Sequence, residues 1–207
     1  MPRRTGSSQR WRQRQERDIY VEQASREGWR SRAVFKLEQI QAKEKLLNRG
    51  MVCVDLGSAP GGFSQLAAKL VGPTGRVIAI DLLPMEPIPG VEFLQGDFMA
   101  PETLEALRNL VGPNPVELVM SDMAPNISGN RTIDQARSLA LLDEALSFAR
   151  EVLRPGGDFL VKAFQGEGID AFTRDLKREF RTVKTLKPKA SRPESREIYL
   201  LARRFGM

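Results

Sequence analysis

The stretch that most constrains the fold is residues 52–70. There an apolar, β-branched run meets Asp55 and passes through a loop of Gly, Ser, Ala and Pro into a helical pattern. This is the strand, turn and helix of an open α/β sheet, in which a small ligand binds beyond the carboxyl end of the strand. The loop matches neither the G-x-G-x-x-G pattern of dinucleotide-binding proteins nor the G-x-x-x-x-G-K-[ST] pattern of P-loop proteins. We therefore expect the ligand to present a cationic or uncharged edge to this acidic loop.

Acidic residues also end the neighbouring apolar runs. Asp81 follows residues 76–80, Asp97 follows residues 91–96, and Asp122 directly follows residues 116–121. Asp81 lies 20 residues after Gly61, a distance at which an acidic residue commonly accepts hydrogen bonds from ribose hydroxyls. The alternative is an Asp that caps the following turn. The carboxylates at Asp55, Asp81 and Asp97 could suggest a magnesium site, but their spacing fits contacts along one extended ligand better, so no metal is expected.

The order of the remaining segments predicts the topology. Helical patterns alternate with strand patterns from residue 31 to residue 180, which is typical of a doubly wound α/β fold with a parallel sheet. Residues 182–186 and 197–203 are two further strands with no helix between them, so we expect them to be antiparallel neighbours. The sequence therefore predicts a mainly parallel sheet with one reversed strand at its end.

One lysine and one missing residue type restrict the chemistry. Lys162 interrupts an apolar run that should be buried. Because burial of a lysine without a partner is costly, Lys162 either has a function or extends its ammonium group to solvent at the edge of the sheet. The chain contains no histidine. This excludes Ser-His-Asp and Cys-His catalysis and most zinc sites, so proton transfer must use Lys, Asp, Glu or Tyr.

The start of the chain is strongly basic. Arginines recur through the first 32 residues, with Trp11, Tyr20 and Trp29 among them, and the net charge of the whole chain is +6. Basic side chains interleaved with aromatic rings suit a phosphate backbone with exposed bases, although a solubilising disordered tail has the same composition. We interpret residues 1–28 as a flexible basic arm and residues 29–207 as a single domain.

Length and composition define the broad class. A chain of 207 residues can form one domain with a full hydrophobic core. No run of 18 or more apolar residues occurs, and the arginine-rich start lacks the apolar segment of a signal peptide, so a soluble protein without a membrane span is expected. The single cysteine, Cys53, excludes an internal disulfide and points to a reducing compartment such as the cytoplasm.

Four motifs stand together in this chain: D-L-G-S-A-P-G-G-F at 55–63, S-D-M-A-P-N at 121–126, V-K-A-F-Q-G at 161–166 and S-R-E-I-Y at 195–199. S-R-A-V-F-K-L at 31–37 and D-L-L-P-M at 81–85 extend the pattern. In combination they resemble the FtsJ/RrmJ-type RNA ribose 2′-O-methyltransferases, over residues 29–204 and in the family's order. The likeness is strongest to the bacterial members that methylate a uridine of 23S ribosomal RNA in the large subunit.

The resemblance implies a fold, a cofactor and site residues. The fold is the Rossmann-like methyltransferase fold, with seven strands of which the last is antiparallel. The family's Lys-Asp-Lys-Glu catalytic tetrad falls on Lys36, Asp122, Lys162 and Glu197. The contacts to the cofactor, S-adenosylmethionine, map to Gly61, Gly62 and Phe63 in the loop, Asp81 at the ribose, Asp97 near the adenine and Asp122 near the methionine end. Relatives often carry Trp at the position of Phe63, so a hydrogen bond from an indole N–H is lost here.

The resemblance also implies a reaction and a partner. S-adenosylmethionine carries a methyl group on a sulfonium cation, and a ribose 2′-oxygen attacks that methyl in line. Lys162 either acts as a neutral base for the 2′-hydroxyl or stays charged and orients it, with Asp122 beside it and with Lys36 and Glu197 positioning the nucleotide. The implied substrate is the assembled 50S subunit, and the implied role is in ribosome maturation. We expect a cytoplasmic monomer.

Two other functions are compatible with parts of the sequence. A nicotinamide-dependent oxidoreductase would share the α/β sheet, but the missing G-x-G-x-x-G pattern counts against it. An RNA-binding assembly factor would keep the fold without catalysis, but the four tetrad residues are all present. Binding of S-adenosylmethionine against NAD distinguishes the first alternative, and methyl transfer to ribosomal subunits distinguishes the second.

Overall fold

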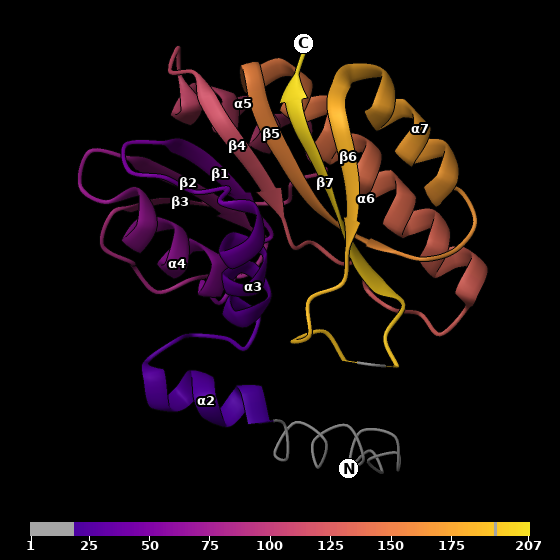
Figure 1. Ribbon diagram of the computed structural model, residues 1–207, viewed down its shortest axis with the longest axis horizontal. Helices are drawn as coiled ribbons and strands as arrows, with labels where there is room; N and C mark the ends of the chain where they lie inside the picture. Colours follow the sequence, from indigo (N-terminus) through magenta and orange to yellow (C-terminus); the bar gives the residue numbers. More distant parts are fainter. Residues whose placement is uncertain (1–18, 193) are drawn as a thin grey trace.

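A computed structural model describes residues 19–192 and 194–207, and over these residues seven strands form one sheet in the order β3-β2-β1-β4-β5-β7-β6 (Figure 1). The strands are β1 (Val52–Leu56), β2 (Arg76–Asp81), β3 (Val91–Gln95), β4 (Val116–Ser121), β5 (Leu153–Phe164), β6 (Phe180–Leu186) and β7 (Glu197–Phe205). β7 pairs antiparallel with both β5 and β6, and the other pairs are parallel. The predicted fold, a mainly parallel sheet with its last strand reversed, is confirmed.

Helices cover both faces of the sheet. They are α2 (Ile19–Glu27), α3 (Val34–Glu44), α4 (Gly62–Val71), α5 (Pro101–Val111), α6 (Arg131–Val152) and α7 (Ile169–Glu179). Buried side chains of α5, α6 and α7 form one core with the sheet, and those of α2, α3 and α4 form the other. Alternate residues of β1 enter opposite cores, Val54 one and Cys53 the other, which explains why this strand is apolar on both faces. No helix within the described residues is long and apolar enough to cross a bilayer.

The strand order reverses between β1 and β4. From β1 the chain moves outward to β2 and β3, and it then returns to place β4 on the other side of β1. In open α/β sheets a ligand binds at such a reversal, beyond the carboxyl ends of the strands. The residues after β1 and β4 therefore lie at the edge where a site is expected.

The structure differs from the predicted flexible arm in one part. Residues 1–18 lie outside the described residues, but Ile19–Glu27 is the helix α2. Its Ala24 is buried, and the Tyr20 ring lies 5.5 Å from the Phe35 ring of α3. The Trp29 backbone N–H also donates to the Ala24 carbonyl oxygen at 2.8 Å. The tertiary contact with α3 gives this polar segment an apolar anchor, which its sequence pattern did not indicate.

The start of β5 is irregular. Pro155, Gly156 and Gly157 are residue types that often mark a turn, yet they lie inside β5, which begins at Leu153. Leu153 pairs with Val116 of β4, and the register then shifts before Leu118 pairs with Asp158. A bulge of this kind accommodates Pro and Gly within a strand, so the turn residues mark an irregularity rather than an end.

Candidate active site

Two ion pairs meet where β4, β5 and β7 approach α3. Lys162 of β5 lies with its Nζ 3.1 Å from Oδ1 of Asp122, and it also donates to the Asp122 carbonyl oxygen. Lys36 of α3 lies with its Nζ 2.7 Å from Oε1 of Glu197, the first residue of β7. All four side chains are largely removed from solvent. The structure thus brings the four predicted tetrad residues together, as two adjacent pairs.

The backbone explains why Asp122 lies at this place. Its N–H donates to the Leu56 carbonyl oxygen at 3.0 Å, which continues the β1–β4 pairing one residue beyond β4. Lys162 stands opposite Tyr199 in the β5–β7 ladder. A buried lysine needs a partner, and Lys162 finds it in Asp122 rather than in solvent at the sheet edge.

Tyr199 joins the two ion pairs and is a residue to which the sequence analysis gave no role. Its hydroxyl donates to Oδ1 of Asp122 at 2.5 Å, and Nζ of Lys36 lies 5.8 Å from the centre of its ring. The ring also stacks on Phe63, with 6.4 Å between centroids. Residues two apart on a strand share a face, so a tyrosine two positions after Glu197 was the available signal.

The charges of this cluster keep Asp122 anionic. Burial alone would raise the pKa of Asp122, but Lys162, Lys36 and the Tyr199 hydroxyl together outweigh burial and hold it below the usual range. Burial, with the Asp122 charge next in size, raises the pKa of Tyr199 well above its ordinary value, so this phenol stays a hydrogen-bond donor. The cluster therefore presents a fixed carboxylate that can face a cation.

A cavity of about 470 Å³ opens beside Asp122 at the strand-order reversal. Among the residues that line it are three of the predicted cofactor contacts, Asp81, Asp97 and Asp122. Its volume falls in the range of small-molecule sites. Within the described residues no group of three or more His, Cys, Asp or Glu is arranged to hold a metal ion.

Asp81 makes the turn-capping contact that was the alternative interpretation, and it lines the cavity as well. One oxygen accepts from the Leu83 N–H at 2.8 Å and the other from the Ala59 N–H at 2.8 Å. Asp97 likewise accepts from the Met99 N–H at 2.9 Å. A carboxylate has about four lone-pair positions, so both residues keep acceptor capacity for a ligand.

The three predicted contacts in the loop occupy another position. Gly61, Gly62 and Phe63 are not among the residues that line this cavity, and they lie where α4 begins. A Cβ at Gly62 would stand 2.3 Å from Oγ of Ser31, so this glycine lets the loop pack against the segment before α3. Phe63 is buried against Tyr199. Their contact with a cofactor stays a prediction.

Apolar side chains at the cavity were missed by the sequence analysis. Leu82, Leu83 and Met99 line it, although each is exposed to 45% or more. They lie one or two residues after Asp81, the last residue of β2, and after Asp97, which follows β3, in the segments D-L-L and D-F-M. Two apolar residues just after such a carboxylate were therefore the available signal for an apolar part of the cavity.

Asp55 gives the folded protein a pH-dependent stability. Its side chain is fully buried, one oxygen accepts from the Ser64 hydroxyl at 2.6 Å, and the other has no partner among the described residues. Burial raises the pKa of Asp55 to about 7. The folded state therefore retains a proton that the unfolded chain, with an ordinary pKa near 4, releases first.

We expect the free energy of unfolding to fall between about pH 4 and pH 7 because of Asp55, by at most about 4 kcal/mol. Asp55→Asn removes this titration and should flatten the profile in that window. Urea unfolding of both proteins at pH 5, 6, 7 and 8 measures the difference. Parallel profiles for the two proteins would contradict the assignment.

A model of one protein family, FtsJ-like methyltransferase, matches residues 29–205 of this chain. Among curated proteins, the chain is 54% identical over 205 residues to the ribosomal RNA large subunit methyltransferase E of Alkalilimnicola ehrlichii, covering 99% of this chain and 98% of that protein. This extent of likeness shows common family membership.

Solved structures agree with this result. One, named as that of a ribosomal RNA methyltransferase of Plasmodium falciparum, superimposes with a TM-score of 0.77 at 28% identity and covers 86% of this chain and 99% of that chain. A second, named as an rRNA methylase of Clostridium thermocellum, has a TM-score of 0.57 at 19% identity and covers 82% of this chain and 97% of that chain, which supports the fold alone.

Proposed function

This chain belongs to the FtsJ-like methyltransferase family, and we propose that it methylates the 2′-hydroxyl of a uridine ribose in 23S ribosomal RNA with S-adenosylmethionine as the methyl donor. The observation that carries the proposal is the cluster of two ion pairs, Lys162 with Asp122 and Lys36 with Glu197, in which Asp122 also lines the cavity. The proposed substrate is the assembled large subunit, modified by a monomer during maturation. Such a substrate would place the enzyme in the cytoplasm.

The residues of the cavity fit S-adenosylmethionine. Asp81 and Asp97 offer acceptors for the ribose hydroxyls and the adenine amino group, and Leu82, Leu83 and Met99 offer apolar surface for the adenine ring. Asp122, kept anionic by its lysine neighbours, suits the positively charged methionine end. Gly61, Gly62 and Phe63 are proposed contacts at the start of α4, where helix N–H groups favour a carboxylate. When bound, the cofactor supplies an electrophilic methyl group on a sulfonium cation.

The contacts of Lys162 favour its role as a charged orienting group. An ammonium has three N–H donors, and Asp122 accepts from Lys162 through both its carboxylate and its carbonyl oxygen. The remaining donor direction can hold the 2′-oxygen of the substrate, so that a lone pair of that oxygen faces the methyl group. Positioning of this kind supplies a large share of a rate enhancement. After methyl transfer, the 2′-oxygen loses its proton to solvent water.

Lys36 and Glu197 are proposed to hold the target nucleotide. They line a second cavity, of about 230 Å³, together with Arg32, Arg192 and Ser195. A carboxylate can accept from a ribose hydroxyl, and the cationic side chains suit the phosphates on either side of the target. RNA binding here should therefore weaken steeply as salt is raised.

Ser191 is proposed to position Glu197. It is buried, and its hydroxyl donates at 2.9 Å to Oε1 of Glu197, the same oxygen that pairs with Lys36. We expect Ser191→Ala to lower kcat/KM roughly tenfold, because a hydrogen bond to a charged group is lost. The affinity for S-adenosylmethionine should not change. Ser191→Thr keeps the hydroxyl and should recover most of the activity; equal losses in both variants would assign Ser191 a packing role only.

The function itself is tested with large ribosomal subunits from cells that lack the modification. The purified protein and radiolabelled S-adenosylmethionine should give label in 23S RNA, and mapping of 2′-O-methyl groups should find it on one uridine. Titration calorimetry should show binding of S-adenosylmethionine and none of NAD. Binding without transfer would favour the RNA-binding assembly factor, and binding of NAD would favour the oxidoreductase.

A further inference from the structure

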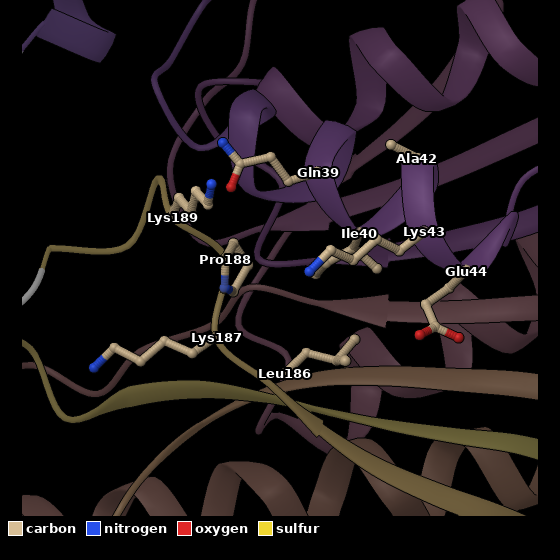
Figure 2. Close-up of a pocket in the computed structure, with 9 residues that line it drawn as sticks. All are labelled: Gln39, Ile40, Ala42, Lys43, Glu44, Leu186, Lys187, Pro188 and Lys189. Carbon is tan, nitrogen blue, oxygen red and sulfur yellow. The ribbon is translucent and has the colours of Figure 1, made fainter.

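A third cavity lies away from the methyl-donor site, between α3 and the segment that follows β6 (Figure 2). Its volume is about 310 Å³. Apolar side chains and lysines make up most of its lining, which consists of Gln39, Ile40, Ala42, Lys43, Glu44, Leu186, Lys187, Pro188 and Lys189. Figure 2 shows the side chain of Lys43 beside Ile40 on the helix wall, with Pro188 and Leu186 on the opposite wall. The cavity therefore combines an apolar interior with a cationic rim.

Both walls of this cavity lead to the proposed active site. Lys36, Ile40 and Lys43 are spaced four and three residues apart on α3, so they share one face, and Lys43 lies about 10 Å along the axis from Lys36. The opposite wall continues from Pro188 to Ser191, which binds Glu197. A strand of RNA whose target ribose lies at Lys36 and Glu197 can thus reach the cavity with a nucleotide close to the target.

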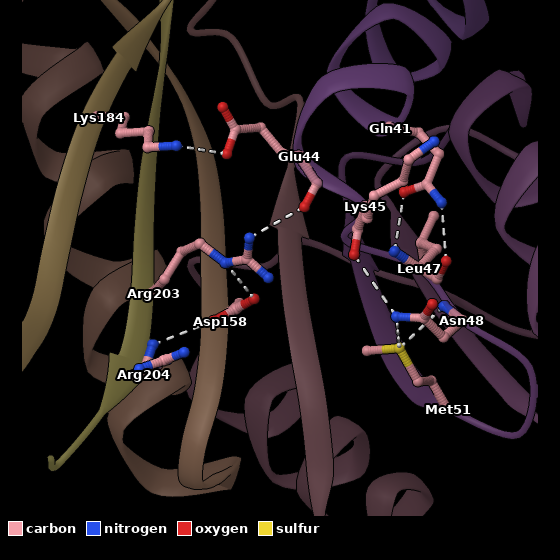
Figure 3. Close-up of polar contacts among 10 residues, drawn as sticks. All are labelled: Gln41, Glu44, Lys45, Leu47, Asn48, Met51, Asp158, Lys184, Arg203 and Arg204. Carbon is pink, nitrogen blue, oxygen red and sulfur yellow. Dashed lines mark hydrogen bonds and ion pairs between the residues drawn. The ribbon is translucent and has the colours of Figure 1, made fainter.

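Contacts at both ends of the cavity fix α3 relative to the sheet and to the segment after β6. Nζ of Lys184 on β6 lies 2.8 Å from a carboxylate oxygen of Glu44, and Arg203 of β7 donates to the Glu44 carbonyl oxygen at 2.9 Å (Figure 3). Arg203 is itself paired with Asp158 at 2.9 Å. The Ala190 N–H donates to the Gln39 side chain at 3.1 Å near the other end. The end of α3 is therefore fixed to the sheet, and the cavity is preformed.

The charge of the rim selects an anion. Lys184 already neutralises Glu44, and Lys187 donates to the Ser195 carbonyl oxygen. Lys43 and Lys189 are exposed, and neither side chain makes an ion pair or hydrogen bond with a described residue. Two lysines without side-chain partners, in a cavity that Ile40, Leu186 and Pro188 also line, match a ligand that joins a phosphate to a flat apolar ring.

We propose that this cavity binds a nucleotide of the RNA substrate other than the target, with its base against Ile40, Leu186 and Pro188 and its phosphate on Lys43 and Lys189. The inference rests on the proposed function, because it takes RNA as the substrate. A second contact of this kind fixes the direction and register of the strand across the active site, since phosphate contacts position a nucleic acid.

The test compares Lys43→Glu/Lys189→Glu with Arg174→Glu/Lys177→Glu, which makes the same change in net charge at two exposed positions of α7 on the opposite face of the sheet. With large subunits as substrate, the double variant should raise KM by roughly tenfold or more and reduce the slope of log affinity against log salt by about 2. Its kcat and its affinity for S-adenosylmethionine should stay at wild-type values, and Arg174→Glu/Lys177→Glu should resemble the wild type.

Ala42→Trp provides an independent variant, because Ala42 is exposed and a large side chain there would fill the cavity without changing charge. It should raise KM as well. A photoreactive phenylalanine analogue at the same position should cross-link to 23S RNA near the modified uridine. Cross-linking to a ribosomal protein instead, or an unchanged KM in both variants, would overturn the inference. If the wild type transfers no methyl group to the subunits, the proposed function itself is wrong. If the wild type is active and the variants behave as the wild type does, the nucleotide site alone is wrong.

Discussion

Lys162→Ala is expected to lower the rate of methyl transfer by about 10²–10⁴, the range for loss of a group that handles or orients a reacting hydroxyl. The reason is that Lys162 pairs with Asp122, which lines the cavity, and no other lysine pairs with that carboxylate in the described chain. S-adenosylmethionine should still bind within a few-fold of the wild type, because the Asp122 carboxylate remains. Single-turnover methylation and titration calorimetry measure the two quantities separately.

Lys162→Arg separates the two possible roles. Arginine keeps the positive charge and cannot lose its proton, so it can orient a hydroxyl but cannot act as a base. Partial activity in Lys162→Arg, with none in Lys162→Ala, would support the orienting role. Equal inactivity of the two, with kcat of the wild type rising at high pH, would support a neutral base. Wild-type turnover in Lys162→Ala would exclude both roles.

Gly57→Ala is expected to destabilise the fold by about 2–5 kcal/mol and to abolish measurable binding of S-adenosylmethionine. Gly57 follows β1 with φ of +78°, and a Cβ there would lie 2.6 Å from Cγ of Met123 and 3.0 Å from its backbone N and Cα. Because Met123 directly follows Asp122, relief of this clash must shift the carboxylate that faces the cavity. Urea unfolding and calorimetry measure the two effects.

Gly90→Ala is the matched control for this substitution. Gly90 has φ of +79°, so the backbone strain of an alanine is the same, but its nearest atom, Cβ of Ala68, lies at an ordinary 3.8 Å. We expect a loss of about 1–2 kcal/mol and unchanged binding of S-adenosylmethionine. Equal losses of stability and affinity in the two variants would show that strain alone, and not the contact with Met123, makes Gly57 necessary.

The edge of the sheet at which the site lies could be predicted from local patterns. Asp81, Asp97 and Asp122 each follow an apolar run, and all three line one cavity because parallel strands end at the same edge. The tetrad was assigned from motif likeness, since nothing local in Lys36 or Glu197 distinguishes them from solvated surface residues. The role of Tyr199 could not be assigned from local sequence either. Its place in a strand was evident, but its bond to Asp122 depends on the register between β5 and β7.

The sequence by itself determined the alternation of strands and helices, the reversed last strand, the absence of histidine chemistry and the family. These follow from residue types and from spacings of a few residues, which act locally along the chain. Only the tertiary structure decided that Lys36 pairs with Glu197, that α2 is anchored on α3, and that a cationic cavity opens between α3 and Pro188. Each joins segments distant in sequence, and such contacts depend on sheet register and on the packing of helices over the sheet, which no local pattern encodes.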